Sequence, residues 1–161
     1  MFSKYKTIQE ALDASPVGAT IYIEEGVYHE ALTLTKDVRL VGRGAVTITT
    51  DSGSTISIKS GHIQLEELFI HHTDSSQNFD AVVIYTPEHH HLSVHMRHVT
   101  SQSVYHSGLY CNHGEYEVHL EQCLIEQCRH NGVGIGNGAN PTFHQCVIRA
   151  NQSIGVFVFN G

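Results

Sequence analysis

The sequence predicts an all-β fold: one right-handed parallel β-helix, or solenoid, with a short N-terminal capping α-helix. Three observations predict it: a repeat of about two dozen residues, short runs of alternating apolar residues, and Gly, Asn, Asp, Ser or His between the runs. Residues 1–161 are expected to form a single domain, with the cap in 1–18 and the stacked coils in 19–161.

Residues 7–15 predict the capping helix. Thr7 followed three residues later by Glu10 is a capping-box pattern, and Ser15-Pro16 ends the helix. Its apolar side contains Ile8, Ala11 and Leu12. Strands are predicted at 20–23, 27–34, 38–41, 46–50 and 55–59. A helix in front of the first coil covers strand hydrogen-bonding groups that would otherwise be exposed.

The repeat is clearest in the second half of the chain. Residues 108–114 align with 132–138 and with 155–161, and residues 120–125 align with 143–148. Looser copies lie at 96–101 and 65–70. A unit this short, with several strands and no helix, cannot bury its own inner face, so the units must stack. About six or seven coils are expected.

Stacking in parallel register predicts which side chains become vertical neighbours. Leu120 is expected beside Phe143, and Cys123 beside Cys146. Two apolar columns are expected to line the interior: Val82, Leu109, Val133 and Val156, and Ile84, Cys111, Ile135 and Val158.

Several N-terminal segments carry a family resemblance. Residues 5–12 (YKTIQEAL), 18–23 (GATIYI), 26–30 (GVYHE) and 38–42 (VRLVG) resemble the start of pectin-lyase-like right-handed parallel β-helix proteins, especially pectin methylesterases. The repeats from about residue 92 resemble those of NosD-like and carbohydrate-binding β-helix proteins. The resemblance covers nearly the whole chain and implies the fold, because most matching residues are core or corner positions.

The resemblance also implies what catalysis would need. Pectin methylesterases use two Asp and an Arg on a groove face, and the related lyases use an Asp cluster for calcium and a basic residue. This sequence has no Asp after Asp80, so neither pattern is present. The long corner from Thr73 to Asp80 is expected to be a polar turn, and no catalytic residue is assigned. The best outward polar trio is Glu121 over His144, with Arg97 on the other side.

Outward aromatic residues mark a candidate binding surface. By strand parity these are Tyr85, Tyr110, Phe157 and Phe159. Gly134 and Gly136 are expected to leave a dip between them. Exposed aromatic residues on a flat sheet are typical of a sugar platform or a protein contact. The last coil is apolar inside and outside, which predicts a partner surface or a longer natural chain, truncated here.

These features favour a non-enzymatic binding or assembly module that self-associates, or continues into further repeats, through an uncapped C-terminal coil. The alternative is a pectin-lyase-like carbohydrate-active enzyme or polysaccharide-binding domain. A homo-oligomer is therefore the expected partner arrangement, with a polysaccharide as the other partner considered.

Fourteen histidines are the compositional oddity. His95 and His119 are expected to stack on the outer face and are the weak candidates for a metal site. His71 and His72 are expected one coil earlier. His89, His90 and His91 alternate between faces, so they are not expected to bind one ion. No metal or other cofactor is expected.

The four cysteines, Cys111, Cys123, Cys128 and Cys146, are expected to stay reduced. Three of them fall in inward columns, where a thiol behaves as a small hydrophobic group. Cys123 and Cys146 fall near the Cα separation that a disulfide needs. Separately, His113, Asn137 and Asn160 are expected to form a corner ladder of polar side chains.

Composition excludes some partners. The net charge of −7 argues against a nucleic-acid binder, which needs a basic face. No apolar run approaches a membrane span, and no hydrophobic signal core is seen, so a cytoplasmic location without membrane partners is expected.

Overall fold

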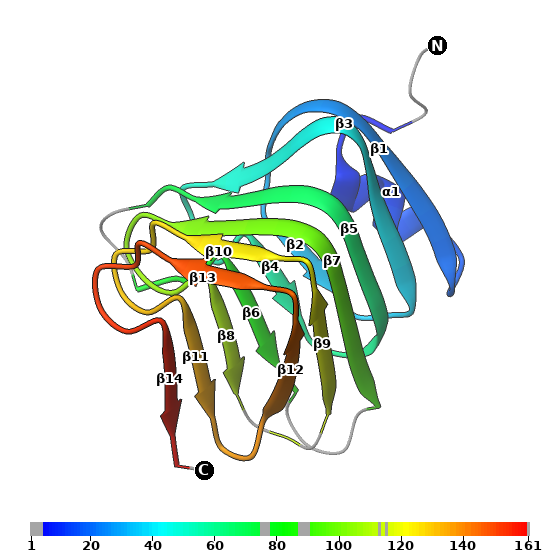
Figure 1. Ribbon diagram of the computed structural model, residues 1–161. Helices are drawn as coiled ribbons and strands as arrows, with labels where there is room; N and C mark the ends of the chain where they lie inside the picture. Colours follow the sequence, from blue (N-terminus) through cyan, green and yellow to red (C-terminus); the bar gives the residue numbers. More distant parts are fainter. Residues whose placement is uncertain (1–4, 75–77, 87–90, 113, 115, 161) are drawn as a thin grey trace.

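Parallel coils stack along one axis in the computed structural model, which describes residues 5–74, 78–86, 91–112, 114 and 116–160 (Figure 1). The strands form two sheets, and the strand pairs in both are parallel. The predicted all-β right-handed parallel β-helix with one short N-terminal helix is therefore confirmed.

The larger sheet follows the order β1-β3-β5-β7-β10-β13; in addition, β9 pairs with β7, and β12 pairs with β9. Its strands are β1 (Ala19–His29), β3 (Val38–Thr50), β5 (Gly61–His72), β7 (Leu92–Ser103), β9 (Glu117–Glu121), β10 (Leu124–Glu126), β12 (Asn140–His144) and β13 (Val147–Arg149). The smaller sheet contains β2 (Leu32–Leu34), β4 (Ile56–Ile58), β6 (Val82–Tyr85), β8 (Leu109–Asn112), β11 (Val133–Gly136) and β14 (Val156–Phe159).

The described part of the chain winds about five times, fewer than the six or seven coils expected. The coils are not equally long. Where β5 pairs with β7, the residues aligned across the two coils are 31 positions apart, as for His62 and Ser93. A repeat of about two dozen residues, read from the second half, therefore overestimates the number of turns.

Register confirms the predicted columns. Leu120 pairs with Phe143, and the Val147 N–H donates to the Cys123 carbonyl at 2.9 Å, so Cys123 lies beside Cys146. Both predicted apolar columns of the smaller sheet are in register from β6 to β14. Their members in β6 and β8 are completely buried. The core is thus a stack of Val, Ile and Leu layers, each buried by the next coil.

A single corner bends the larger sheet in every coil from β5 onward. Its residues have positive φ without being glycine: Glu67 (55°), His98 (51°), Gln122 (52°) and Gln145 (53°). This left-handed conformation is uncommon for residues with a Cβ, so the neighbouring coils must hold each corner in place. No pattern in the sequence predicts this corner.

Helix α1 (Ile8–Ala14) covers the N-terminal end, as predicted (Figure 1). The Thr7 hydroxyl accepts a hydrogen bond from the Glu10 N–H at 3.0 Å, which is the capping contact the sequence predicts. The Glu30 carboxylate, from the end of the first strand, accepts from two further N–H groups of the first turn. Ile8 and Leu12 are buried against the first coil.

Among the described residues, no helix has the length and apolar character needed to cross a bilayer.

Candidate functional sites

Three of the four predicted aromatic residues come together on the outer face of the smaller sheet. Tyr110, Phe157 and Phe159 form what we call the aromatic cluster. The Tyr110 and Phe159 ring centroids are 5.9 Å apart, and those of Phe157 and Phe159 are 5.8 Å apart, with nearly parallel planes. Tyr85 pairs with Asn112, so it lies diagonal to Tyr110 and not directly beside it.

Glycines on β11 allow the aromatic cluster to form. A Cβ added at Gly134 would lie 2.7 Å from the Tyr110 ring, and one added at Gly136 would overlap the Phe159 ring. The predicted dip is therefore wrong: the two rings lie across the glycines and fill the space. The result is a continuous apolar surface and not an open slot.

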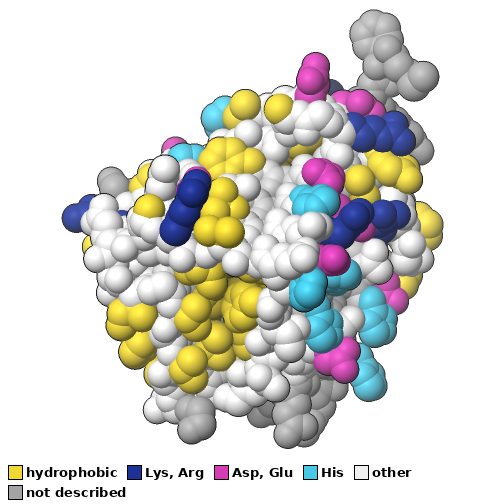
Figure 2. Space-filling view, in the orientation of Figure 1, with side chains coloured by type: hydrophobic (Ala, Val, Ile, Leu, Met, Phe, Trp, Pro, Cys, Tyr) yellow, Lys and Arg dark blue, Asp and Glu magenta, His cyan; other side chains and the backbone are white. Residues whose placement is uncertain are grey.

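The last coil also exposes residues that belong to the interior columns. Val156 is 42% exposed and Val158 is 60% exposed, whereas Val133, the partner of Val156 in β11, is completely buried. Figure 2 shows hydrophobic side chains gathered over the region of β11 and β14. The aromatic cluster and this open edge together make one apolar region, which we call the terminal surface.

A second candidate site is the outer face of the larger sheet, where β5, β7, β9 and β12 run side by side. Figure 2 shows histidine and acidic side chains on this face, which we call the histidine face. Register aligns two columns across it: Gln64, His95, His119 and Thr142, and Glu66, Arg97, Glu121 and His144. The face is thus a regular polar grid on a flat sheet.

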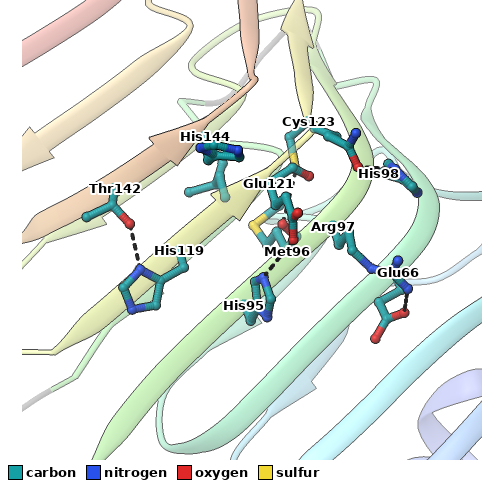
Figure 3. A network of polar contacts seen from close by, with 12 residues as sticks. Glu66, His95, Met96, Arg97, His98, His119, Glu121, Cys123, Thr142 and His144 are labelled. Carbon is teal, nitrogen blue, oxygen red and sulfur yellow. Dashed lines mark hydrogen bonds and ion pairs between the residues drawn. The ribbon is translucent and has the colours of Figure 1, made fainter.

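His95 and His119 are neighbours in register, as predicted, but His71 and His72 do not extend their column. His71 pairs with Gln102, and His72 with Ser103, because both lie beyond the corner at Glu67. The His119 Nδ1 lies 2.6 Å from the Thr142 hydroxyl, and the His95 Nε2 lies 3.7 Å from Glu121 (Figure 3).

A metal site is not formed by these side chains. Within the residues that the structure describes, no three His, Cys, Asp or Glu side chains group so that they could hold an ion. His89 and His90, part of the predicted histidine run, lie outside the described residues.

The predicted polar trio is in place, and it belongs to a longer chain of charges. Register sets Glu121 between Arg97 and His144. In the preceding coils, Arg39 binds Glu66 through two hydrogen bonds of 2.7 and 3.0 Å, and Arg97 binds the same carboxylate (Figure 3). Sequence reasoning missed Glu66, although the charge signs alternate down its column.

Two guanidinium groups fix the charge on Glu66. Hydrogen bonds from Arg39, the largest cause, and from Arg97 together lower the pKa of Glu66 to about 2. The Glu66 side chain is 9% exposed. Through these two arginines, the Glu66 carboxylate joins three coils. Because it stays ionised and does not take up a proton near neutral pH, it is unsuited to act as a general base.

Two histidines at corners, His98 and His106, make contacts between neighbouring coils. The His98 ring nitrogens lie 2.6 Å from Glu67 and 2.6 Å from Gln122. The His106 Nδ1 lies 2.6 Å from Asp80, and its ring stacks on that of His130. The carboxylate partners raise the pKa of both histidines.

A buried histidine precedes the long corner that ends at Asp80, and the Phe79 ring packs edge-on against it with the ring centroids 6.3 Å apart. His72 is completely buried, with its Nδ1 at 3.2 Å from the Ser103 hydroxyl, and burial lowers its pKa. Its Nε2 makes no hydrogen bond to any of the residues that the structure describes. The middle of the corner, residues 75–77, lies outside the described residues.

The predicted corner ladder can be followed at Asn137. The Asn137 side chain donates a hydrogen bond to the Asn112 side-chain oxygen at 2.6 Å, one residue before the position predicted. His113, the predicted rung, lies outside the described residues, so that rung stays a prediction. The contact between Asn137 and Asn112 joins two coils.

Comparisons with known proteins agree with this architecture. A family model described as a right handed beta helix region matches residues 19–161. No curated protein matches the sequence. A crystal structure of a pectin methylesterase mutant in complex with a hexasaccharide aligns with a TM-score of 0.50 and 18% identity, over 84% of this chain and 52% of that one. This chain therefore spans about half of that structure, and the likeness confirms the expected pectin-lyase-like fold.

Glu66→Gln tests whether the charge chain stabilises the stack. The variant leaves Arg39 and Arg97 without their shared carboxylate, so we expect the free energy of unfolding to fall by about 1–3 kcal/mol in urea titrations. The matched control is Glu24→Gln, which removes an exposed ion pair with Arg43 and is expected to cost less than about 0.5 kcal/mol. Equal losses in the two variants would contradict the role of Glu66.

The corner histidines predict a pH dependence of stability. Because the folded pKa of His98 and of His106 is raised, their contribution is complete below the unfolded value of 6.5 and is lost as the pH rises through the folded pKa. Burial of His72 acts in the opposite direction, so the difference between wild type and variant is the quantity to measure.

We expect the stability advantage of wild type over His98→Gln/His106→Gln to grow as the pH falls from about 8.5 to about 6, in urea titrations at each pH. His29→Gln, at an exposed position, serves as the control and should keep the wild-type slope. Parallel slopes for wild type and the double variant would show that these contacts do not form in solution.

Proposed function

The chain belongs to the right-handed β-helix family, and from that premise we propose that it is a non-enzymatic assembly module that self-associates through its terminal surface. The observation that carries this proposal is that β14 exposes apolar side chains from both of its faces. Val158 belongs to an interior column and is 60% exposed, and Phe157, on the outer face, is 40% exposed.

The apolar edge supports a partner on energetic grounds. In every earlier coil, the residues of these columns are buried by the next strand, as Val133 is by Val156. Covering Val156 and Val158 in the same way would remove apolar area from water and stabilise the contact by roughly 25 cal/mol for each Å² buried. The aromatic cluster extends this apolar area around the side of the coil.

The backbone of β14 supports the same conclusion. One edge of β14 pairs with β11, and its other edge has no strand partner among the described residues. A strand edge with free N–H and C=O groups is a template for another strand. A partner strand could satisfy these groups and bury the valines together.

In a second copy, only the terminal surface offers an uncovered strand edge. Helix α1 covers the N-terminal end and buries its own Ile8 and Leu12 there. Two copies would therefore meet through their terminal surfaces across a two-fold axis, and such an isologous contact closes at a dimer.

The ion pairs of the histidine face support a structural and not a catalytic role for that face. Glu66 on this face is held by two Arg side chains. Beyond the corner, on β10, Glu126 is likewise held by Arg149 at 2.8 Å and by Gln102. Carboxylates committed to contacts between coils are not available for acid–base chemistry.

The first experiment measures the mass of residues 1–161 in solution by light scattering over a range of concentrations. We expect a dimer, and we expect Phe157→Asp/Phe159→Asp and, separately, Val158→Lys to be monomeric, because charges cannot be buried in the contact. Val27→Lys is the matched control, since Val27 is 61% exposed on β1 at the other end of the stack. A monomeric wild type at every concentration would refute self-association.

A polysaccharide-binding module is the second candidate. Tyr85, which is 42% exposed, and Tyr110 lie on the outer face of the smaller sheet, and the similar pectin methylesterase was solved with a hexasaccharide. Aromatic rings on a flat surface suit stacking against sugar rings.

For this candidate, the wild-type protein would be retained on an oligosaccharide array, and Tyr85→Ala/Tyr110→Ala would lose that retention. Tyr22→Ala is the control, because Tyr22 is an exposed tyrosine on the other sheet. Absence of wild-type retention would exclude the second candidate while leaving the light-scattering result unaffected.

A further inference from the structure

Cys123 and Cys146 occupy the same position in neighbouring coils. Each follows a corner residue with positive φ, Gln122 or Gln145, and the next residues, Leu124 and Val147, are paired in register. Neighbouring residues in such a stack are about 4.8 Å apart. This separation falls within the range of roughly 4.4–6.8 Å between the Cα atoms of disulfide-bonded cysteines.

The two thiols are oriented alike. The Cys123 Sγ lies 3.3 Å from the Met96 carbonyl oxygen, and the Cys146 Sγ lies 3.4 Å from the Leu120 carbonyl oxygen, in each case in the preceding coil. Each Sγ also lies 3.4 Å from a carbonyl oxygen of its own coil, that of Glu121 or His144. The two thiols thus share one orientation, and the Cys146 Sγ contacts the coil that carries Cys123.

The two thiols differ in access to solvent. Cys123 is 3% exposed, and burial raises its pKa to about 11. Cys146 is half-buried, because it lies in the last coil. A soluble oxidant would thus meet Cys146 first, and Cys123 is placed to react only with a group already attached to Cys146.

We propose that Cys123 and Cys146 are a site of reversible disulfide formation by exchange with a low-molecular-weight disulfide such as oxidised glutathione. The Cys146 thiolate attacks one sulfur of the reagent, forming a mixed disulfide and releasing one thiolate. The Cys123 sulfur then attacks the Cys146 sulfur and releases the second. The two protons from the cysteines end on the two released thiolates, so one protein dithiol and one glutathione disulfide give one protein disulfide and two glutathione thiols.

The position of the pair predicts its properties. Stacked sulfurs must turn toward each other to bond, so the disulfide is strained and easily reduced. The last coil can adjust because β13 pairs with β10 and has no second strand partner among the described residues. Once formed, the bond would hold β12, β13 and the coil that carries β14 against the preceding coil.

The other two cysteines provide an internal control. Cys111 lies between Ile84 and Ile135 in its column and is completely buried. Cys128 is also completely buried, and its N–H donates to the Asn151 side chain of the next coil. Neither has a cysteine as its vertical neighbour, so neither is expected to react in the folded protein.

The test incubates the folded chain in glutathione buffers of graded oxidised-to-reduced ratio and follows it by mass spectrometry. We expect the mass of the wild type to fall by two hydrogen atoms and proteolysis to yield a fragment that joins Cys123 and Cys146. Excess reduced glutathione should restore the two hydrogen atoms. Cys123→Ser should instead stop at a mixed disulfide with one glutathione on Cys146. Cys146→Ser should remain unmodified, whereas Cys111→Ser should behave as wild type.

Hydrogen exchange provides a second readout that does not depend on the variants. Amides of β13 and β14 should exchange more slowly in the oxidised protein than in the reduced protein, while those of β3 should not change. A wild type that stays reduced at every ratio, or that crosslinks another pair of cysteines, would overturn the proposal.

Discussion

The structure depends on one interaction, the in-register stacking of parallel coils. Each coil leaves an apolar inner layer and a row of backbone hydrogen-bonding groups that only another coil can satisfy. Val82, Leu109 and Val133 are buried because each has a similar residue above and below it. The same requirement explains α1 at one end, where a short helix takes the place of a coil. At the other end, no further strand among the described residues covers β14, and its interior valines are exposed there.

Polar side chains at the surface of the solenoid work mainly between coils. Glu66 joins Arg39 and Arg97, His98 joins Glu67 and Gln122, and Asp80 receives His106. Contacts of this kind fix the vertical alignment that the apolar columns alone would leave less specific, because Val, Ile and Leu layers resemble one another. The abundant histidines thus serve in part as rungs, and His98 and His106, whose pKa values their carboxylate partners raise, hold the stack most firmly when they are protonated.

The terminal surface and the histidine face differ in what they offer a partner. The terminal surface is apolar, continuous with the core and bordered by an unpaired strand edge, which are the features of a protein contact. The histidine face is flat, and many of its charges are already engaged within the chain. The pair of thiols lies between these two surfaces along the chain. Cys146 follows β12, which belongs to the histidine face, and precedes β13, the strand before β14.

The sequence by itself determined the solenoid, the capping helix, the vertical neighbours in the second half, and the outward direction of the aromatic residues. These follow from a constant period and from strand parity, both of which are local properties of the chain. The tertiary structure decided the number of turns, the separation of His71 and His72 from His95, and the rings of Tyr110 and Phe159 lying across Gly134 and Gly136. It also decided the arginine clamp on Glu66. These features depend on coil lengths that vary and on a left-handed corner made by residues other than glycine. The left-handed corner has no local signal in the sequence, because packing between coils imposes it. The variation in coil length has one local sign, the long corner from Thr73 to Asp80, but the length of each turn is set by where the strands pair.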